Sequence, residues 1–334
     1  MRLVSVVTPC FEEEANVREL HRRVRDVFAA LPGYDYEHIF IDNASRDGTA
    51  ERVKAIAAAD ARVKLIVNAR NFGHVRSPVY GMLQASGDAV VLMASDLQDP
   101  PELIPAFIDA WERGHKVVFG IKKQTTEPLP MRLVRKWYYD LIGRLADIEL
   151  ARDATGFGLY DRAVIEVLER IDDPYPYLRG LVSEIGFEAA RVEFVKPARK
   201  RGRSKNSFYT LYDLAMLGIT SHSKVPLRLA AMLGFAMAGV SLCVAVAYLV
   251  AKLVFWKEFQ LGLAPLVVGL FFFSSVQLFF VGVIGEYIGA IYTQVLRRPL
   301  VVEKERVNFD DGDGARPAAA PRLAGARLED GRLS

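Results

Sequence analysis

"DAVVLMASDLQDPPE" (residues 88–102) joins an apolar run to a turn that is rich in acids and ends in two prolines. The run is short and rich in valine, which is typical of a strand buried on both faces of a sheet. Asp96, Gln98 and Asp99 follow it, and proline does not continue a central strand. The stretch therefore predicts a buried strand with three oxygen-bearing side chains beyond its carboxyl end.

Apolar runs of the same kind recur in the N-terminal part of the chain and alternate with amphipathic segments. Strands are predicted at 3–8, 37–42, 63–67, 88–93 and 116–120. Helical patterns lie between them, near 16–31, 48–59, 74–86 and 101–113. This alternation predicts an α/β fold with a mostly parallel sheet that is covered on both faces.

Polar side chains gather where four of these strands end. The groups are 12–14, 42–47, Arg70 with Asn71, and 96–99. One acidic turn alone is commonly a helix cap, as "SRDGT" would be. Ligands of open α/β sheets bind beyond the carboxyl ends of the strands, so four such turns in succession predict one cleft.

The chemistry of this predicted cleft is limited by the motifs that are present and missing. Neither a dinucleotide-binding G-x-G-x-x-G nor a P-loop occurs, and the five histidines lack the spacing of zinc ligands. Acidic oxygen ligands instead suit Mg²⁺ or Mn²⁺ holding a diphosphate. The net charge of +3 is too small to indicate a nucleic-acid partner.

Two long uncharged runs follow the predicted α/β region, at Leu229–Ala251 and Phe259–Gly285. About 20 apolar residues cross a bilayer core, so each run is long enough to span one. Buried core helices are the alternative, but core helices of this length without charge are rare. The short linker with Trp256 predicts a hairpin of two spans.

The basic residues predict how such a hairpin is oriented. "KPARKRGRSK" (196–205) precedes the first span, and Arg297 and Arg298 follow the second. By the positive-inside rule, the N-terminal domain and the C-terminus lie in the cytoplasm. Cys10 and Cys243 are far apart, so no disulfide is expected. The start of the chain has too short an apolar core for a signal peptide.

The remaining segments complete the predicted domain organisation. The region 207–228 contains apolar residues at helical spacing, which predicts an amphipathic helix on the membrane surface. Residues 128–150 form either a second such helix or an outer helix of the globular domain. The domains are therefore 1–206, the interfacial helix, the hairpin 229–296, and a C-terminal segment 297–334 that is disordered from about 310.

Six strings in order resemble a known family: "VVTPCFEEEANV", "FIDNASRDGT", "NARNFGH", "SGDAVVLMASDLQDPPE", "TGFGLYDRAVI" and "RKRGRSKNSF". They resemble polyprenyl-phosphate glycosyltransferases, bacterial relatives of dolichol-phosphate mannose synthase. The similarity spans roughly residues 3 to 307. It implies a GT-A fold followed by two membrane helices, and a homo-oligomer with a tetramer among the candidates. No Q-x-x-R-W follows, which argues against a processive polysaccharide synthase.

The resemblance assigns roles to residues at matching positions. It implies that the nucleotide is bound by Pro9, Phe11, Glu13, Asp42, Arg70 and Asn71. It implies that Asp96 is the metal ligand. It also implies that Gln98 and Asp99 line the place where sugar and acceptor meet. For lipid phosphate or diphosphate it implies Arg179 and the loop residues Arg199, Gly202, Ser204 and Lys205, with Arg199 and Lys205 also counted as catalytic.

Four positions depart from the family pattern. Glu12 stands for an Asn, Asn43 for a second Asp, and Gly158 for an Arg. Ala94 stands for the first acid of the D-x-D motif, which leaves Asp96 as the metal carboxylate. Mg²⁺ commonly uses one or two carboxylates with phosphate and water, so one strong acid is sufficient.

The expected activity is an inverting, metal-dependent transfer of a hexose from a nucleotide sugar, preferably a UDP-hexose, to undecaprenyl phosphate in the bacterial inner membrane. The product would serve envelope glycan modification. A membrane scaffold or flippase partner with an inactive transferase domain is one alternative. A transferase with a soluble or protein acceptor is another. The sequence does not name the sugar.

Overall fold

The computed structural model describes residues 1–122, 154–195, 216–217, 220, 225–254 and 263–309. The chain divides into two compact units. The first, here the sheet unit, contains Met1–Glu127, Ala151–Lys205 and Arg297–Ser334, and the second, the hairpin unit, contains Pro128–Leu150 and Asn206–Leu296. The tail from 310, the basic loop, the segment 128–150 and most of the expected interfacial helix lie outside the described residues.

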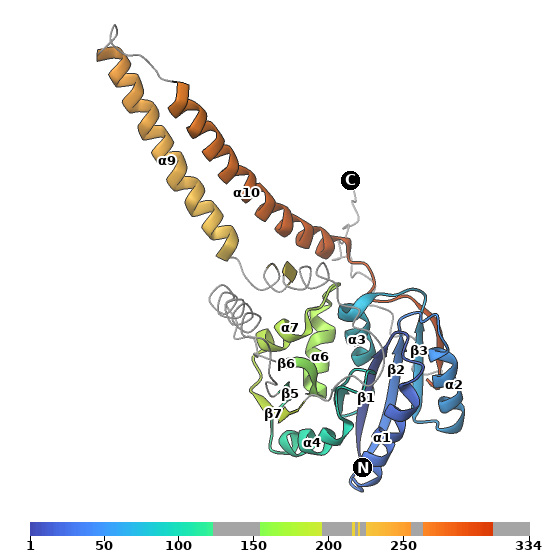
Figure 1. Cartoon of the computed structure of the whole chain (residues 1–334). Coiled ribbons are helices and arrows are strands. Elements are labelled where there is room, and N and C mark those ends of the chain that lie inside the picture. Colours follow the sequence, from blue (N-terminus) through green and yellow to red (C-terminus); the bar gives the residue numbers. More distant parts are fainter. Residues whose placement is uncertain (123–153, 196–215, 218–219, 221–224, 255–262, 310–334) are drawn as a thin grey trace, which may run out of the picture. The chain divides into compact units, whose positions relative to one another are not determined.

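A mixed sheet of eight strands, in the order β7-β5-β6-β4-β1-β2-β3-β8, runs through the described part of the sheet unit (Figure 1). The strands are β1 (Arg2–Cys10), β2 (Tyr34–Asp42), β3 (Val63–Asn68), β4 (Ala89–Leu92), β5 (Val117–Lys122), β6 (Ala154–Asp161), β7 (Ala189–Phe194) and β8 (Glu303–Val307). β4, β1, β2 and β3 are adjacent and parallel, whereas β6 and β8 pair antiparallel with their neighbours. The five predicted strands are confirmed, and β6, β7 and β8 were not predicted.

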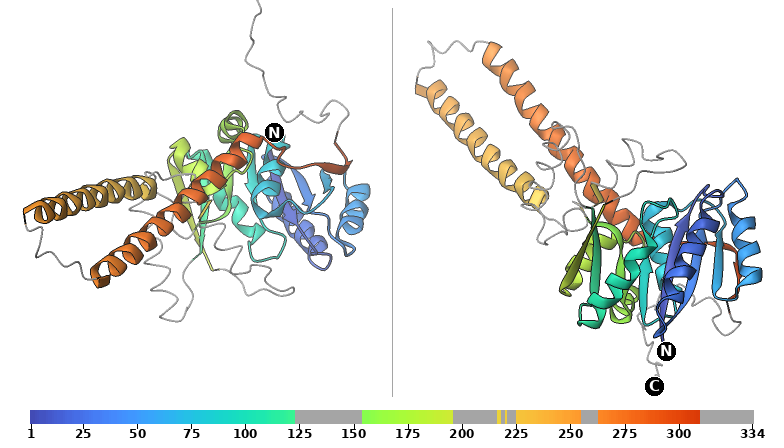
Figure 2. Two further views of the ribbon diagram at one scale, coloured as in Figure 1. Left: turned by 90° about the horizontal axis from the view of Figure 1, so that it is seen from above. Right: turned by 60° about the horizontal axis from the view of Figure 1, so that its bottom comes forward.

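Helices cover both faces of this sheet, as the sequence predicts (Figure 2). They are α1 (Val17–Ala29), α2 (Thr49–Ala59), α3 (Gly73–Leu83), α4 (Ile104–Glu112), α6 (Arg162–Ile171) and α7 (Leu178–Ile185), with a short 3₁₀ turn η1 (Pro101–Leu103) before α4. Side chains of α1, α2 and α4 share one apolar core with one sheet face. Those of α3, α6 and α7 share a second core with the other face. The four predicted helices are confirmed.

The central strand β1 shows why the strands of this sheet appear in the sequence as apolar runs. Val4 and Val6 lie in the core beneath α1 and α2, while Val7 lies in the opposite core. Successive side chains of a strand point to opposite faces, so a strand covered on both sides needs apolar residues at consecutive positions.

Gly158 in β6 occupies a site where a side chain does not fit. β6 lies between β4 and β5, and a Cβ at this position would overlap the backbone oxygen of Val118. The close approach of β5 therefore explains why glycine, rather than the family's usual Arg, occupies this position.

The edge strand β8 comes from the end of the chain and pairs with β3. Glu303 accepts a hydrogen bond from the Tyr80 hydroxyl of α3 at 2.8 Å. Glu305 pairs with Lys54 of α2 at 2.7 Å. Asn308 donates from Nδ2 to the carbonyl oxygens of Ala57 and Val63 at 2.8 and 2.9 Å. The chain that leaves the hairpin unit thus returns to complete the sheet.

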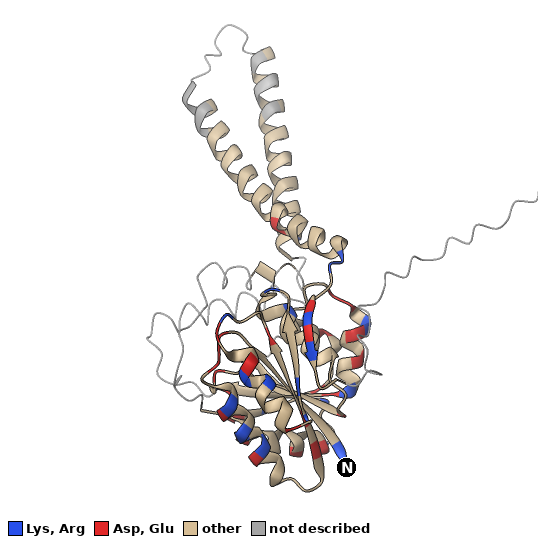
Figure 3. Ribbon diagram, turned by 90° about the vertical axis from the view of Figure 1, so that its right-hand side faces the viewer, with Lys and Arg blue, Asp and Glu red and all other residues tan. Residues whose placement is uncertain are grey.

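Two long helices, α9 (Val225–Val254) and α10 (Leu263–Leu296), lie side by side in the hairpin unit. Figure 3 shows them with almost no charged residues. Two segments, Val225–Val244 and Gly269–Leu296, are long and apolar enough to cross a membrane, and 6% and 0% of their most apolar windows are buried in the described structure. Such exposure does not fit the core-helix alternative. The helices overlap both predicted spans, although α10 continues beyond Gly285.

Candidate functional site

Four loops meet at the edge of the sheet where β4, β1, β2 and β3 end, because these strands are adjacent and parallel. Hydrogen bonds join neighbouring loops. Ser95 donates from Oγ to the Pro9 carbonyl at 3.1 Å. The backbone N–H of Glu12 donates to Ser45 Oγ at 2.8 Å. The structure therefore brings together the polar turns that the sequence placed at one cleft.

Three of these loops contain a residue in the left-handed backbone region. The φ angles are 57° at Glu12, 59° at Ala44 and 61° at Leu97. L-residues other than Asn and Asp rarely adopt this conformation, and a bulky residue such as Leu97 rarely does so without a constraint. Strain of this kind gathers at ligand sites, where the surrounding structure holds it.

Asp42, predicted to contact the nucleotide, closes the turn after β2. It is only 1% exposed. Its carboxylate accepts hydrogen bonds from the Ser45 backbone N–H at 3.0 Å and the Ser45 hydroxyl at 2.5 Å. Burial raises the pKa of Asp42, although the Ser45 bonds oppose that shift. The side chain is therefore rigidly placed at the floor of the site.

Asn43 links the loop after β2 to the end of β3 and to the start of α3, and its role was not predicted. Its Oδ1 accepts from Asn68 Nδ2 at 2.8 Å and from the Phe72 backbone N–H at 3.3 Å. Its Nδ2 donates to the Gly73 carbonyl at 3.3 Å. Asn68 in turn donates to Ser77 Oγ at 3.0 Å. An amide at the end of each of two neighbouring parallel strands is the sequence signal that would have suggested this network.

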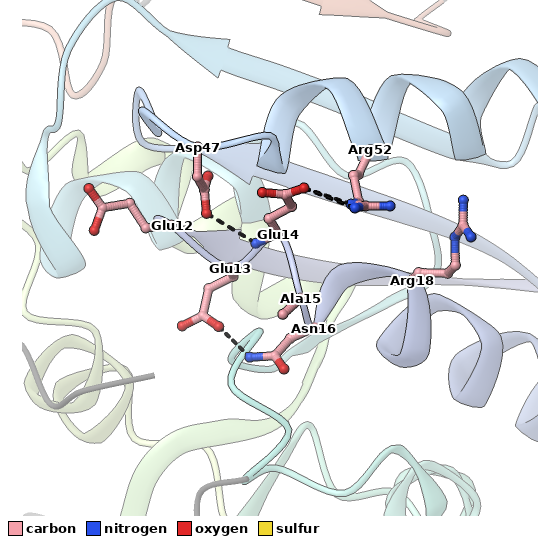
Figure 4. A pocket seen from close by; sticks show the side chains of 8 residues that line it. All are labelled: Glu12, Glu13, Glu14, Ala15, Asn16, Arg18, Asp47 and Arg52. Carbon is pink, nitrogen blue, oxygen red and sulfur yellow. Dashed lines mark hydrogen bonds and ion pairs between the residues drawn. The ribbon is translucent and has the colours of Figure 1, made fainter. Parts of the chain in front are cut away.

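An acidic pocket of about 500 Å³ lies beside the β1 loop (Figure 4). It is lined by Glu12, Glu13, Glu14, Ala15, Asn16, Arg18, Asp47 and Arg52. Glu14 pairs with Arg52 at 2.9 Å, and Glu13 accepts from Asn16 Nδ2 at 2.5 Å. Carboxylates repel phosphate but accept hydrogen bonds from hydroxyl and N–H groups. The pocket therefore suits a ribose or a base rather than a diphosphate.

The loop after β4 contains Asp96, Gln98 and Asp99. Asp99 is 6% exposed, and its Oδ2 accepts from the Ala94 backbone N–H at 3.0 Å. Asp96 is more exposed, and its Oδ1 accepts from the Gln98 N–H at 3.1 Å. Asp99 thus holds the turn closed, while Asp96 has the more accessible carboxylate.

The donor atoms of this loop decide whether a divalent cation fits. Within the described ranges no group of three or more His, Cys, Asp or Glu side chains could hold a metal ion. Asp96 supplies a partly exposed carboxylate, and Mg²⁺ needs only one or two of these when phosphate and water complete its shell. The residues present therefore fit a metal that arrives with a diphosphate ligand.

The loop after β3 carries the predicted Arg70 and Asn71. Asn71 Oδ1 accepts from the Gly73 N–H at 2.7 Å at the start of α3. The Arg70 guanidinium lies 4.1 Å from the centre of the Phe72 ring and donates to the Asn71 carbonyl at 3.2 Å. Arg70 is exposed, so it remains accessible to solvent at the edge of the site.

Other predicted residues lie on different elements. Arg179 is in the first turn of α7, with its guanidinium 5.3 Å from the Tyr177 ring centre. It contributes to lowering the pKa of His74, after the burial of the imidazole itself. Pro9 is the second-last residue of β1, and Phe11 follows the end of that strand. Arg199, Gly202, Ser204 and Lys205 lie outside the described residues.

Comparisons with known proteins agree with this arrangement. The family model described as "Glycosyl transferase family 2" matches residues 5–168. The uncharacterised glycosyltransferase YkcC of Bacillus subtilis (strain 168) is 35% identical over 308 residues, which cover 92% of this chain and 95% of that protein. The SfII prophage-derived bactoprenol glucosyl transferase of Shigella flexneri is 34% identical over 303 residues, covering 90% of this chain and 97% of that protein.

Solved structures are less similar. The glucosyl-3-phosphoglycerate synthase of Mycobacterium tuberculosis, in complex with Mn²⁺, uridine diphosphate and phosphoglyceric acid, is 20% identical with a TM-score of 0.45. The match covers 66% of this chain and 76% of that chain.

Proposed function

The chain belongs to glycosyl transferase family 2 and has its GT-A fold, and on that premise we propose that it transfers a hexose from a nucleotide sugar to undecaprenyl phosphate. One observation carries the proposal: the same chain has the polar edge of β1 to β4 and two helices apolar enough to cross a membrane. A soluble acceptor would not account for the two apolar helices.

The donor would lie across the ends of β1, β2 and β3. Asp42 and Glu13 accept hydrogen bonds from the base and ribose, and Pro9 and Phe11 form the floor beside them. Arg70 and Asn71 lie beside the nucleotide. Most of these groups are already fixed by bonds to neighbouring loops, so little side-chain freedom is lost on binding.

The diphosphate would lie near the loop after β4. Asp96 would hold a Mg²⁺ or Mn²⁺ ion, which when bound offsets the charge of the departing nucleoside diphosphate. Gln98 and Asp99 border the place where sugar and acceptor meet. Ala94 supplies its backbone N–H to Asp99 but no carboxylate, so the metal affinity rests on Asp96 and the phosphates.

The acceptor phosphate needs positioning rather than deprotonation, because it is already an anion at pH 7. One of its oxygens forms a bond to the anomeric carbon as the bond to the β-phosphate oxygen breaks. The nucleoside diphosphate leaves with the electron pair, and the anomeric configuration inverts. Arg179, Arg199, Ser204 and Lys205 would hold the phosphate oxygens during this displacement.

The proposal extends to the donor sugar, the cellular location and the assembly of the enzyme. Relatives such as the Shigella flexneri protein are named as bactoprenol glucosyl transferases, which supports a polyprenyl phosphate acceptor and favours a UDP-hexose donor. The basic residues around the hairpin support an inner-membrane protein whose catalytic domain and C-terminus lie in the cytoplasm. A homo-oligomer is proposed from the family resemblance alone.

The test is transfer of radiolabelled sugar to undecaprenyl phosphate by the purified full chain with Mg²⁺ or Mn²⁺, over a panel of nucleotide sugars. Asp96→Asn should reduce the rate at least a hundredfold, because it removes the charge that holds the metal. Asp109→Asn is the matched control, since Asp109 is exposed on α4 and pairs only with Arg113 within the described residues.

Three results would separate the alternatives. Metal-dependent glycolipid from one donor, lost in Asp96→Asn and kept in Asp109→Asn, supports the proposal and names the sugar. Nucleotide binding without transfer from any donor would favour an inactive, scaffold-like protein. Transfer to a soluble acceptor alone would contradict the lipid assignment.

A further inference from the structure

Three arginines of the sheet unit are not among the residues that line the acidic pocket. Arg70 is in the loop before α3, Arg76 is inside α3, and Arg298 is just beyond the end of α10 in the chain. Within the described residues, none of the three forms an ion pair with a carboxylate. The proposed function uses Arg70 beside the nucleotide and assigns nothing to Arg76 or Arg298.

Arg76 has a polar atom without a partner. Its Nε is buried and has no hydrogen-bond partner in the part of the chain that the structure describes. Its guanidinium lies 5.1 Å from the centre of the Tyr175 ring, which can contact the face of the cation but cannot accept an in-plane N–H bond. A buried donor without an acceptor costs stability, so an external acceptor would be favourable here.

The charges of the other two arginines act on Arg76. Burial is the largest cause of the lowered pKa of Arg76, and the positive charges of Arg70 and Arg298 lower it further. Tyr175 acts in the opposite direction. Positive groups brought together in a partly desolvated place are stabilised when an anion binds between them.

Chain connectivity relates this group to a membrane surface. Arg298 is the second residue after Leu296, where α10 and the candidate span Gly269–Leu296 both end. Two residues extend no further than about 7 Å. If α10 crosses the bilayer, Arg298 lies at the level of the lipid headgroups, where arginine binds phosphate.

We propose that Arg76 and Arg298, together with Arg70, form a binding site for the phosphate group of a membrane lipid. Guanidinium groups donate several hydrogen bonds in a plane and match phosphate oxygens. The phosphate belongs either to the polyprenyl acceptor or to an anionic phospholipid, which offer the same chemistry. The inference rests on the proposed membrane insertion, but it does not require that transfer occur.

The experiment measures thermal stabilisation of the full chain in a neutral detergent. Four additions are compared: undecaprenyl phosphate, phosphatidylglycerol, the zwitterionic phosphatidylcholine, and UDP. One or both of the anionic lipids should raise the Tm of the wild type. In Arg76→Gln and Arg298→Gln the lipid concentration for half of that rise should increase at least tenfold, whereas Arg76→Lys should keep most of the response.

Arg113→Gln is the matched control, because Arg113 is an exposed arginine that follows α4 and pairs with Asp109. It should bind lipid as the wild type does. Arg298 is exposed, so Arg298→Gln carries the test if Arg76→Gln does not fold. A Tm rise with undecaprenyl phosphate alone assigns the site to the acceptor. A rise with phosphatidylglycerol, alone or as well, assigns it to the surrounding bilayer.

Two results would overturn the inference. The first is a lipid response that is absent, equal for phosphatidylcholine, or unchanged in both glutamine variants. The second is a response to UDP that both variants lose, which would place the arginines on the donor diphosphate. Because the readout is binding, a wild type that binds anionic lipid through these arginines but transfers no sugar would support the site while contradicting the proposed function.

Discussion

At the scale of single residues, hydrogen bonding explains why Asn43 replaces the family's usual second Asp. Its Nδ2 donates to the Gly73 carbonyl, while its Oδ1 accepts from Asn68 and the Phe72 N–H. A carboxylate can accept but cannot donate, so Asp at this position would face the Gly73 oxygen with another acceptor. The amide of Asn43 therefore supplies both the donor and the acceptor that Gly73, Asn68 and Phe72 require.

Two buried histidines should make the stability of the sheet unit depend on pH. His38 is fully buried and its Nε2 lies 3.0 Å from Thr8 Oγ1, while His21 stacks on it at 5.7 Å between ring centres. Burial lowers the pKa of His21 and, more strongly, that of His38. The unfolded chain, with a histidine pKa of about 6.5, then binds more protons than the folded one.

The expected result is a loss of stability as the pH falls below about 6.5, by up to about 1.4 kcal/mol per pH unit for each histidine. The Tm of the full chain in detergent, measured from pH 7.5 to 5.5, checks this. His38→Gln removes the histidine whose pKa burial lowers most and should flatten the dependence, while His21 and His74, whose pKa values are also lowered, keep the remainder. Arg113→Gln, at an exposed position after α4, should leave it unchanged. Equal slopes in all three proteins would contradict the assignment.

At the scale of elements, β8 shows that a strand with little apolar side-chain area can be held by backbone pairing and polar side-chain contacts. Its sequence "EKERV" has one apolar residue, and its contacts are mostly polar, to Tyr80, Lys54 and Gln84. Charged edge strands are common because they discourage pairing with other chains. In this protein the edge of β3 is covered by a segment that follows the hairpin.

Asn308→Ala should loosen this edge. The side chain donates to two carbonyl oxygens, and its φ of 60° is in the left-handed region that Asn tolerates better than Ala. A loss of about 1–3 kcal/mol is expected. Hydrogen exchange of peptides covering Val63–Asn68 should become faster, whereas Lys304→Ala, at an exposed β8 position, should leave it unchanged. Unaltered exchange in Asn308→Ala would show that these bonds do not secure β8.

At the scale of the whole molecule, the two units are interleaved along the chain. The sheet unit includes Arg297 onward, after the last residue of the hairpin. Truncation before α9 would therefore remove β8 together with the helices and expose the edge of β3. A deletion that tests the hairpin alone must keep β8.

Replacing residues 225–296 by a flexible Gly/Ser linker, with 297–309 retained, should leave a sheet unit that binds the nucleotide sugar with an affinity within about threefold of the full chain. The variant should no longer be an integral membrane protein and should be extracted by alkaline carbonate, and transfer to undecaprenyl phosphate should fall at least a hundredfold. Binding is checked by calorimetry and transfer by the radiolabel assay. Retained transfer would favour a soluble acceptor, and the same linker without 297–309 is the control for β8.

Particular elements show which parts of the fold were predictable. β1 to β5 each contain a short apolar run, because both faces of the sheet are covered, and each was predicted within a few residues. β6 contains Gly156 and Gly158, and β8 is mostly charged, so neither has a strand pattern. These strands form because neighbouring backbones offer hydrogen-bond partners, which a local pattern does not record.

The sequence by itself determined the alternation of strands and helices, the polar ends of four strands, and the two uncharged segments. These follow from residue patterns within a few turns or one strand, where burial and periodicity act locally. Only the tertiary structure decided which groups meet: Asn43 with Asn68 and Gly73, β8 with β3, and Arg76 with Tyr175. Contacts between distant segments depend on strand order and packing, and spacing in the chain does not specify them.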